Sequence, residues 1–167
     1  MLIENLPFHV GATDSPRNPG GLPSSWPIQV SFDAVHGAIT QQATPELERI
    51  LDQAYRLGQL IGTPLDAGTY GKPYADDFLA FIERVKTAPG RALEVGAGVG
   101  YLTRRLSEAG WLARGVEPGI GYRSHWDAHG VDIVNDFFPS PQIAGHFDLI
   151  FSYAVLEHIS DPLPFLR

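Results

Sequence analysis

The chain has 167 residues, which is enough for one domain with a substantial core and an N-terminal extension but too few for two full-sized domains. Its apolar fraction of 44% is that of a globular protein, and its formal charge of -7 predicts neither a nucleic-acid nor a membrane partner. The chain contains no cysteine for disulfides or thiolate-bound zinc, and it has no recognisable targeting segment, so we expect a cytoplasmic protein.

Residues 1–43 are expected to form an N-terminal arm and a short hairpin. The stretch 11–27 is so rich in glycine, proline and serine that it predicts a loop or arm. Apolar residues then alternate with polar ones in "IQVSFD", which is the period of a strand. The run "AVHGAIT" that follows is expected to pair with this strand.

Residues 44–88 are expected to form a helical cap. In "TPELERILDQAYRLGQLIG", residues 44–62, Thr44 suits the N-cap and Pro45 the first helical position. Apolar residues up to Ile61 lie on one face of this helix. A second amphipathic helix is predicted after a glycine- and proline-containing link, because Phe78, Phe81, Ile82 and Val85 recur at helical spacing.

Residues 89–167 repeat the order strand, turn and helix. Strands are predicted at residues 91–96, 111–117, 131–136 and 147–153, and helices at residues 101–110 and 122–129. This alternation predicts an α/β fold with a doubly wound parallel sheet, of which the chain supplies the first four strands. Ligands of such sheets bind outside the carboxyl ends of the strands.

A glycine-rich turn follows the first of these strands and reads Glu94-x-Gly96-x-Gly98-x-Gly100. A phosphate-binding P-loop would need lysine after its last glycine, and a nicotinamide or flavin fingerprint would need glycine at position 101. Tyr101 excludes both patterns. A carboxylate at Glu94 would repel a pyrophosphate, so this turn favours a ligand that carries positive charge.

Two further acids end the next two strands. Glu117 ends the second strand, where a carboxylate can accept hydrogen bonds from both hydroxyls of a ribose. Asp136 ends the third strand, where it could accept from an exocyclic adenine amine while Phe137 lies against the ring. Three carboxylates on successive strand ends therefore predict a site for an uncharged nucleoside with a cationic tail.

The motifs "LEVGAGVG", "GVEP", "VNDFF" and "FDLIFSYAVLEHISDPLPFL" resemble those of class I S-adenosylmethionine-dependent methyltransferases over residues 89–167. The resemblance is to the small-molecule type. It implies a Rossmann-like methyltransferase sheet, S-adenosylmethionine as cofactor, a small-molecule acceptor, and in-line transfer of the methyl group to oxygen or carbon. The candidate cofactor-binding residues are Glu94, Gly96, Ala97, Gly98, Gly100, Glu117, Pro118, Asp136, Phe137 and Ser152.

The same resemblance gives roles to these residues and to the candidate catalytic ones. It implies that Gly96 and Gly98 admit the methionine part of the cofactor, Glu117 holds the ribose, and Asp136 and Phe137 hold the adenine. Ser152 and Tyr153 would lie near the methionine end and the transferred methyl. His158 is the candidate general base because histidine titrates near neutrality, although it could equally be a helix-start residue bonded to the backbone. No metal site is predicted, because the pair His125 and His129 has no third ligand nearby.

The N-terminal half has a fainter resemblance to sugar C-methyltransferases, in which a zinc-binding module and a tyrosine-rich segment precede the same core. The stretches "HGAITQQATPELERILDQAYRLG" and "GTYGKPYADDF" are similar to that layout. Those enzymes bind zinc through cysteines, so this segment would be a metal-free relative. Tyr70 and Tyr74 could close over the cofactor or pack between the cap and the core.

The chain supplies fewer strands than a complete methyltransferase sheet, so it need not be a working enzyme by itself. The family's sheet usually has seven strands, and "FDLIFSY" would be left as an apolar edge able to pair with a second copy in a homo-oligomer. We therefore expect the 167 residues to be a fragment of a longer methyltransferase.

A non-catalytic cofactor-binding or interaction fragment is the alternative function. A nicotinamide-dependent oxidoreductase is less favoured, because of Glu94 and Tyr101. Sugar, quinone and polyketide acceptors are all compatible with the residues present.

Overall fold

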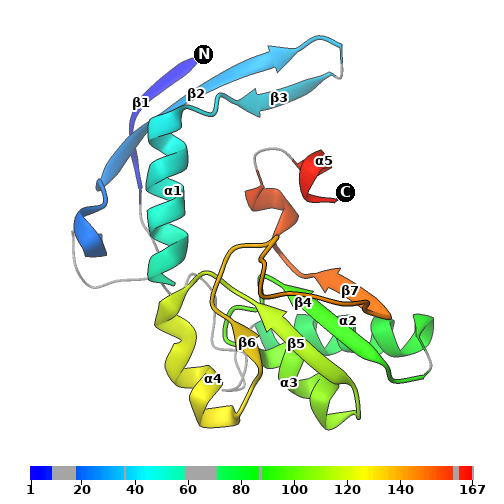
Figure 1. Ribbon diagram of the computed structural model, residues 1–167. Helices are drawn as coiled ribbons and strands as arrows, with labels where there is room; N and C mark the ends of the chain where they lie inside the picture. The colour runs from blue at the N-terminus through cyan, green and yellow to red at the C-terminus, as the bar shows by residue number, and fades with distance from the viewer. Residues whose placement is uncertain (9–17, 36, 59–70, 87, 160–161, 167) are drawn as a thin grey trace.

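The computed structural model describes residues 1–8, 18–35, 37–58, 71–86, 88–159 and 162–166 of the chain. It contains an antiparallel sheet of three strands and a parallel sheet of four (Figure 1). The parallel sheet with helices packed on it confirms the predicted Rossmann-like α/β fold.

The parallel sheet has the strand order β6-β5-β4-β7, so the first strand of the repeat lies inside the sheet. Its central strand β4 pairs with β5 on one side and with β7 on the other. Because all four strands run in the same direction, their carboxyl ends meet at one edge. The strands are β4 (Arg91–Val95), β5 (Leu112–Val116), β6 (Ile133–Val134) and β7 (Leu149–Ser152).

The two faces of the parallel sheet are covered differently, because alternate residues of β4 point to opposite sides. Helices α2 (Gly71–Val85) and α3 (Tyr101–Glu108) pack on the face that carries Ala92. The opposite face carries Leu93 and Val95 and is packed by aromatic side chains, among them Phe165 of α5 (Pro162–Phe165).

Between β5 and β6 the chain forms the short helix η2 (Ile120–Tyr122) and then α4 (Arg123–His129). After β7 it forms η3 (Leu156–His158). The four predicted strands are confirmed, although β6 is only two residues long.

Helix α1 (Pro45–Leu57) begins as the sequence predicts, since Leu47 N donates to the Thr44 hydroxyl at 3.2 Å. It ends earlier than the predicted residue 62, at Gly58, which has a left-handed φ of 60°. A glycine readily adopts this conformation and so ends the helix. Ile61 lies outside the described residues.

The antiparallel sheet is formed by β1 (Leu2–Pro7), β2 (Ser25–Asp33) and β3 (Ala38–Gln41). The hairpin of β2 and β3 is confirmed, with Phe32 opposite Ile39. No element was predicted for β1, because its side chains are mostly exposed and show no clear alternation. Its pairing with β2 depends on a contact between segments distant in sequence, which local patterns do not reveal.

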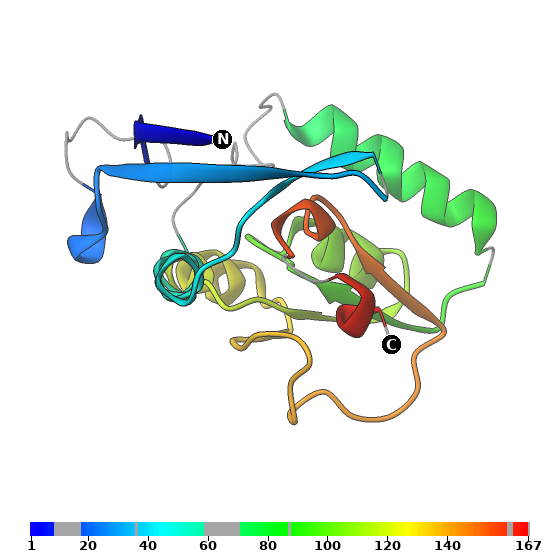
Figure 2. The same ribbon diagram turned by 90° about the horizontal axis from the view of Figure 1, so that it is seen from above.

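Helix α1 and the antiparallel sheet stand on the side of the molecule toward which the parallel strands point (Figures 1 and 2). Ile50 and Ala54 of α1 pack with Leu22 and Trp26, so helix and antiparallel sheet share a small core. The N-terminal segments thus lie at the carboxyl edge of the parallel sheet, where the candidate residues were predicted. Among the described helices, none is long and apolar enough to cross a membrane.

Candidate functional site

The glycine turn, residues 96–100, leads from β4 into α3 with all three of its glycines at positive φ. A Cβ on Gly96 would lie 2.4 Å from Cγ2 of Val155, so packing requires glycine there. Above Gly98 nothing lies within 4 Å of the position that a Cβ would take. The backbone at Gly98 therefore faces open space that a ligand can approach.

Glu94 lies on β4 just before this turn and is directed toward α3. One carboxylate oxygen, Oε2, accepts from Thr103 N at 2.8 Å and from the Thr103 hydroxyl at 2.5 Å. Burial raises the pKa of Glu94 to about 8, because a charged carboxylate is poorly solvated there. Glu94 therefore fixes the first turn of α3 and is a buried acid with a strongly shifted pKa next to the candidate site.

Glu117 follows β5 and reaches back to the glycine turn. Its two carboxylate oxygens accept from Gly98 N at 2.9 Å and from Gly119 N at 2.8 Å. Burial raises the pKa of Glu117, while the two backbone hydrogen bonds oppose that shift. Each carboxylate oxygen has a second lone pair, so the group can still accept from ligand hydroxyls. The structure thus brings together Glu117 and Gly98, as the predicted cofactor site requires.

The next strand end carries Asp136 and Phe137. The Asp136 carboxylate accepts from Phe137 N at 2.9 Å and from the Ser140 hydroxyl at 2.7 Å. These hydrogen bonds, the one from Ser140 first, hold the pKa of Asp136 below its ordinary value. Asp136 therefore remains an ionised acceptor near neutral pH at the end of β6.

Two side chains that sequence reasoning missed hold these strand ends in place. Asn135 donates from Nδ2 to the carbonyls of Glu117 and Pro118, at 2.9 Å each. The buried Trp126 of α4 donates from its indole nitrogen to Gly98 O at 2.7 Å. Asn135 lies beside a predicted residue, but nothing local in the sequence identifies Trp126 as a partner of the glycine turn.

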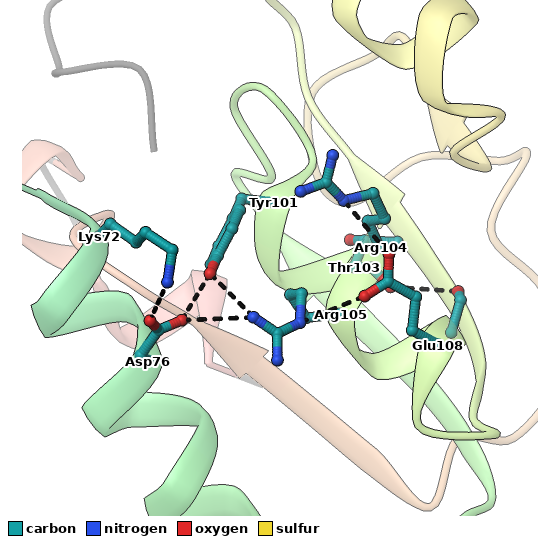
Figure 3. A network of polar contacts seen from close by, with 8 residues as sticks. Lys72, Asp76, Tyr101, Thr103, Arg104, Arg105 and Glu108 are labelled. Atoms are coloured by element: carbon teal, nitrogen blue, oxygen red, sulfur yellow. Dashed lines mark hydrogen bonds and ion pairs between the residues drawn. The ribbon is translucent and has the colours of Figure 1, made fainter. Parts of the chain in front are cut away.

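A network of polar contacts braces the start of α3 against α2 (Figure 3). The Tyr101 hydroxyl donates to Asp76 at 2.5 Å and accepts from Arg105 at 3.1 Å. Lys72 forms an ion pair with the same aspartate. Because Tyr101 follows Gly100 directly, this network helps to fix the helix end of the glycine turn.

The residues predicted near the transferred methyl come from β7 and the segment after it. Ser152 ends β7 and lies opposite Val95 of β4. The Tyr153 ring packs against Phe78 of α2 with centroids 5.0 Å apart. His158 is exposed in η3, and its ring lies 6.0 Å from that of Tyr55 of α1.

The site as a whole therefore combines an exposed glycine backbone with carboxylates on neighbouring strand ends. The described residues contain no group of three or more metal-ligand side chains that could hold a metal ion. A surface pocket of about 560 Å³, lined in part by Arg104 and His129, lies between the last turns of α3 and α4. Those turns precede β5 and β6, so that pocket is at the opposite end of the sheet.

Comparison with known proteins identifies the family and the fold. A sequence profile of the family described as "Methyltransferase domain" matches residues 68–167. The chain is 30% identical over 95 residues to a ubiquinone biosynthesis O-methyltransferase from Marinobacter nauticus, a match that covers 51% of the chain and 40% of that protein. The match thus covers about two fifths of the length of this curated relative.

A similar solved structure is the crystal structure of a magnesium protoporphyrin IX methyltransferase from Synechocystis with bound S-adenosylmethionine. The TM-score is 0.50 at 18% sequence identity, and the match covers 72% of this chain and 67% of that one. At this identity the similarity concerns the fold.

Proposed function

This chain belongs to the methyltransferase-domain family, and on that premise we propose that it binds S-adenosylmethionine at the carboxyl edge of its parallel sheet and methylates a small-molecule acceptor. The observation that carries the proposal is the position of Glu117. Its carboxylate is held by Gly98 N and Gly119 N, beside the open space above Gly98.

The residues present fit the parts of this cofactor one by one. Glu117 would accept from the ribose hydroxyls, and Asp136 would accept from the adenine amine with Phe137 beside the ring. The other cofactor-contacting residues would be Glu94, Gly96, Ala97, Gly98, Gly100, Pro118 and Ser152. The open approach at Gly98 and the ionised acceptor at Asp136 support this assignment.

S-adenosylmethionine supplies a methyl group bonded to a positively charged sulfur, and when that bond breaks the rest of the molecule leaves as a neutral thioether. The task of the protein is to align the acceptor with that methyl and to exclude water, and alignment contributes up to about 7–11 kcal/mol in favourable cases. We assign His158 the role of taking the proton that an oxygen or carbon acceptor loses, and Tyr153 a place near the methyl group.

The acceptor class rests on the similar proteins. One is named for ubiquinone biosynthesis and the other for magnesium protoporphyrin IX, both of which are small molecules. Their names support a small-molecule acceptor for this chain.

The edge of the sheet supports a further proposal about association. Strand β7 pairs only with β4 among the described strands, and Ile150 on it is 59% exposed. A strand with a free edge can pair with another strand, so we propose β7 as the contact in a homo-oligomer.

Calorimetric titration with S-adenosylmethionine and S-adenosylhomocysteine tests the proposed site. Glu117→Ala should weaken the binding of both by about 1.5–3 kcal/mol, the usual value of a charge-assisted hydrogen bond. Asp127→Ala removes an exposed acid of α4 and should bind as the wild type does. Unchanged binding in Glu117→Ala would place the cofactor elsewhere, and binding of NAD instead would favour an oxidoreductase.

A further inference from the structure

The last turn of α1 contacts the loops that follow three of the parallel strands. The helix stands on the side of the sheet toward which these strands point (Figure 1). Gly58 lies against Gly119 after β5, Arg56 lies over Phe137 after β6, and Tyr55 lies beside His158 after β7. These contacts extend along the carboxyl edge at which the cofactor is proposed to bind. The α1 turn, residues 55–58, is therefore an outer wall of that edge.

Arg56 is the cation of this wall. Its guanidinium carbon lies 4.6 Å from the centre of the Phe137 ring, a distance typical of cation–π contact. Its Nε also contacts the carboxylate of Asp52, one turn earlier on α1, at 2.9 Å. Phe137 directly follows Asp136, so the cation lies close to the carboxylate that is proposed to bind the adenine amine.

The backbone of the α1 turn packs closely against the segment that follows β5. A Cβ on Gly58 would lie 2.6 Å from the carbonyl carbon of Gly119, and a Cβ on Gly121 would lie 2.4 Å from Gly58 O. The two segments therefore touch through bare backbone. Because Gly58 is only two residues from Arg56, this contact positions the backbone from which the Arg56 side chain reaches the nucleoside corner.

The chemistry of the corner matches one edge of adenine. Adenine presents its exocyclic amine as a donor, with ring nitrogens on both sides as acceptors. The Asp136 carboxylate can only accept, and a guanidinium can only donate. A carboxylate acceptor and a guanidinium donor at one corner can together complement the amine and one of its neighbouring ring nitrogens.

We propose that Arg56 determines specificity in the nucleoside pocket by donating a hydrogen bond to a ring nitrogen of adenine next to the amine that Asp136 accepts. This inference rests on the proposed function, because it assumes that the adenosyl group of the cofactor occupies this corner. It gives α1 a direct part in cofactor recognition.

If Arg56 were only a surface cation with no contact to adenine, its removal would affect ligand binding differently. The side chains of Arg56 and Asp52 are 57% and 50% exposed, and an exposed ion pair contributes little to stability. Removing such a cation would leave neutral ligands almost unaffected. If Arg56 acted only through its charge, its removal would favour cationic S-adenosylmethionine over neutral S-adenosylhomocysteine.

The test compares S-adenosylhomocysteine with its 7-deaza and 1-deaza analogues, in which C–H replaces one ring nitrogen. In the wild type, one analogue should bind roughly ten- to 150-fold more weakly than the parent, as expected for a hydrogen bond to a charged donor. Arg56→Ala should bind the parent more weakly by a similar factor and should no longer distinguish it from that analogue. Arg49→Ala, an exposed arginine on the same helix, should retain the wild-type pattern.

Loss of the discrimination in Arg56→Ala, with a melting temperature close to that of the wild type, supports the assignment. If the wild type does not distinguish either analogue from the parent, or Arg56→Ala retains the distinction, the assignment is wrong while the proposed function stands. A wild-type chain that binds none of the three ligands would overturn both.

Discussion

At the scale of single residues, the glycines of the turn after β4 serve different purposes although they share the same backbone region. Gly96 is glycine because Val155 fills the place of a side chain, whereas no protein atom fills that place at Gly98. The first is a requirement of packing. The second leaves room for a ligand.

This difference predicts separable effects of two matched substitutions. Gly98→Ala should cost about 1–2 kcal/mol, the usual strain of a side chain at left-handed φ, and should strongly weaken S-adenosylhomocysteine binding. Gly96→Ala carries the same strain and an added clash with Val155, so its melting temperature should be much lower. Thermal melts and titrations of both variants measure this. Equal melting temperatures, or full binding by Gly98→Ala, would contradict the distinction.

The raised pKa of Glu94 predicts that the free energy of unfolding depends on pH. Its pKa rises from 4.5 to about 8 on folding, so between these values the folded state holds a proton that the unfolded state has lost. The free energy of unfolding should therefore decrease as the pH rises from about 4.5 to about 8, and this contribution should be constant above that range. Glu94→Gln keeps an oxygen acceptor for Thr103 and removes the ionisable group.

Urea unfolding at two pH values measures this effect. Wild type and Glu94→Gln should have nearly equal midpoints at about pH 5, and the variant should be more stable at about pH 9. Glu83→Gln on an exposed position of α2 controls for the loss of one charge. The same difference between wild type and Glu94→Gln at both pH values would show that burial does not shift this group.

Residue types and strand ends were predictable at this scale, but side-chain directions were not. The positions of Glu117 and Asp136 follow from the strand pattern. That Glu94 bonds to Thr103 depends on how α3 packs, and the contact of Arg56 with Phe137 joins residues far apart in sequence. Local spacing carries no information about such contacts.

At the scale of elements, the docking of α1 decides the shape of the site. Its amphipathic pattern and N-cap predicted the helix and its start. The end at Gly58 was not predicted, because the apolar pattern continues beyond it to Ile61. The left-handed conformation of Gly58 and its contact with Gly119 overrule that local pattern.

Two helix-ending glycines provide a matched test of this docking. Gly58 after α1 and Gly130 after α4 have φ values of 60° and 61°, so alanine should cause similar backbone strain at both. Only Gly58 has backbone atoms within 3 Å of the added Cβ, whereas at Gly130 nothing lies within 4 Å. Gly58→Ala should therefore be the less stable variant and should bind S-adenosylhomocysteine more weakly than Gly130→Ala. Indistinguishable stability and affinity in the two variants would mean that α1 does not depend on this contact.

At the scale of the whole molecule, a parallel sheet provides the strand ends, and N-terminal segments stand over them (Figure 2). The alternation of strands, turns and helices after residue 88 was enough to predict the sheet, since that order has few solutions. The antiparallel strand β1 escaped prediction because its mostly exposed residues carry no periodic signal. The position of α1 likewise depends on packing between distant segments. Helix α2, which was expected to belong to the cap, packs with α3 on a face of the parallel sheet instead.

The measurement that tests the central claim most directly is a titration of the isotope-labelled chain with S-adenosylhomocysteine, followed through its backbone amide resonances. The signals of Gly98, Gly119 and Phe137 should move most, because these amides lie on the loops proposed to hold the nucleoside and the amino-acid tail. Gly37 in the hairpin turn should not respond. Shifts confined to the pocket between α3 and α4, around Ser107 and Gly130, would contradict the proposed site.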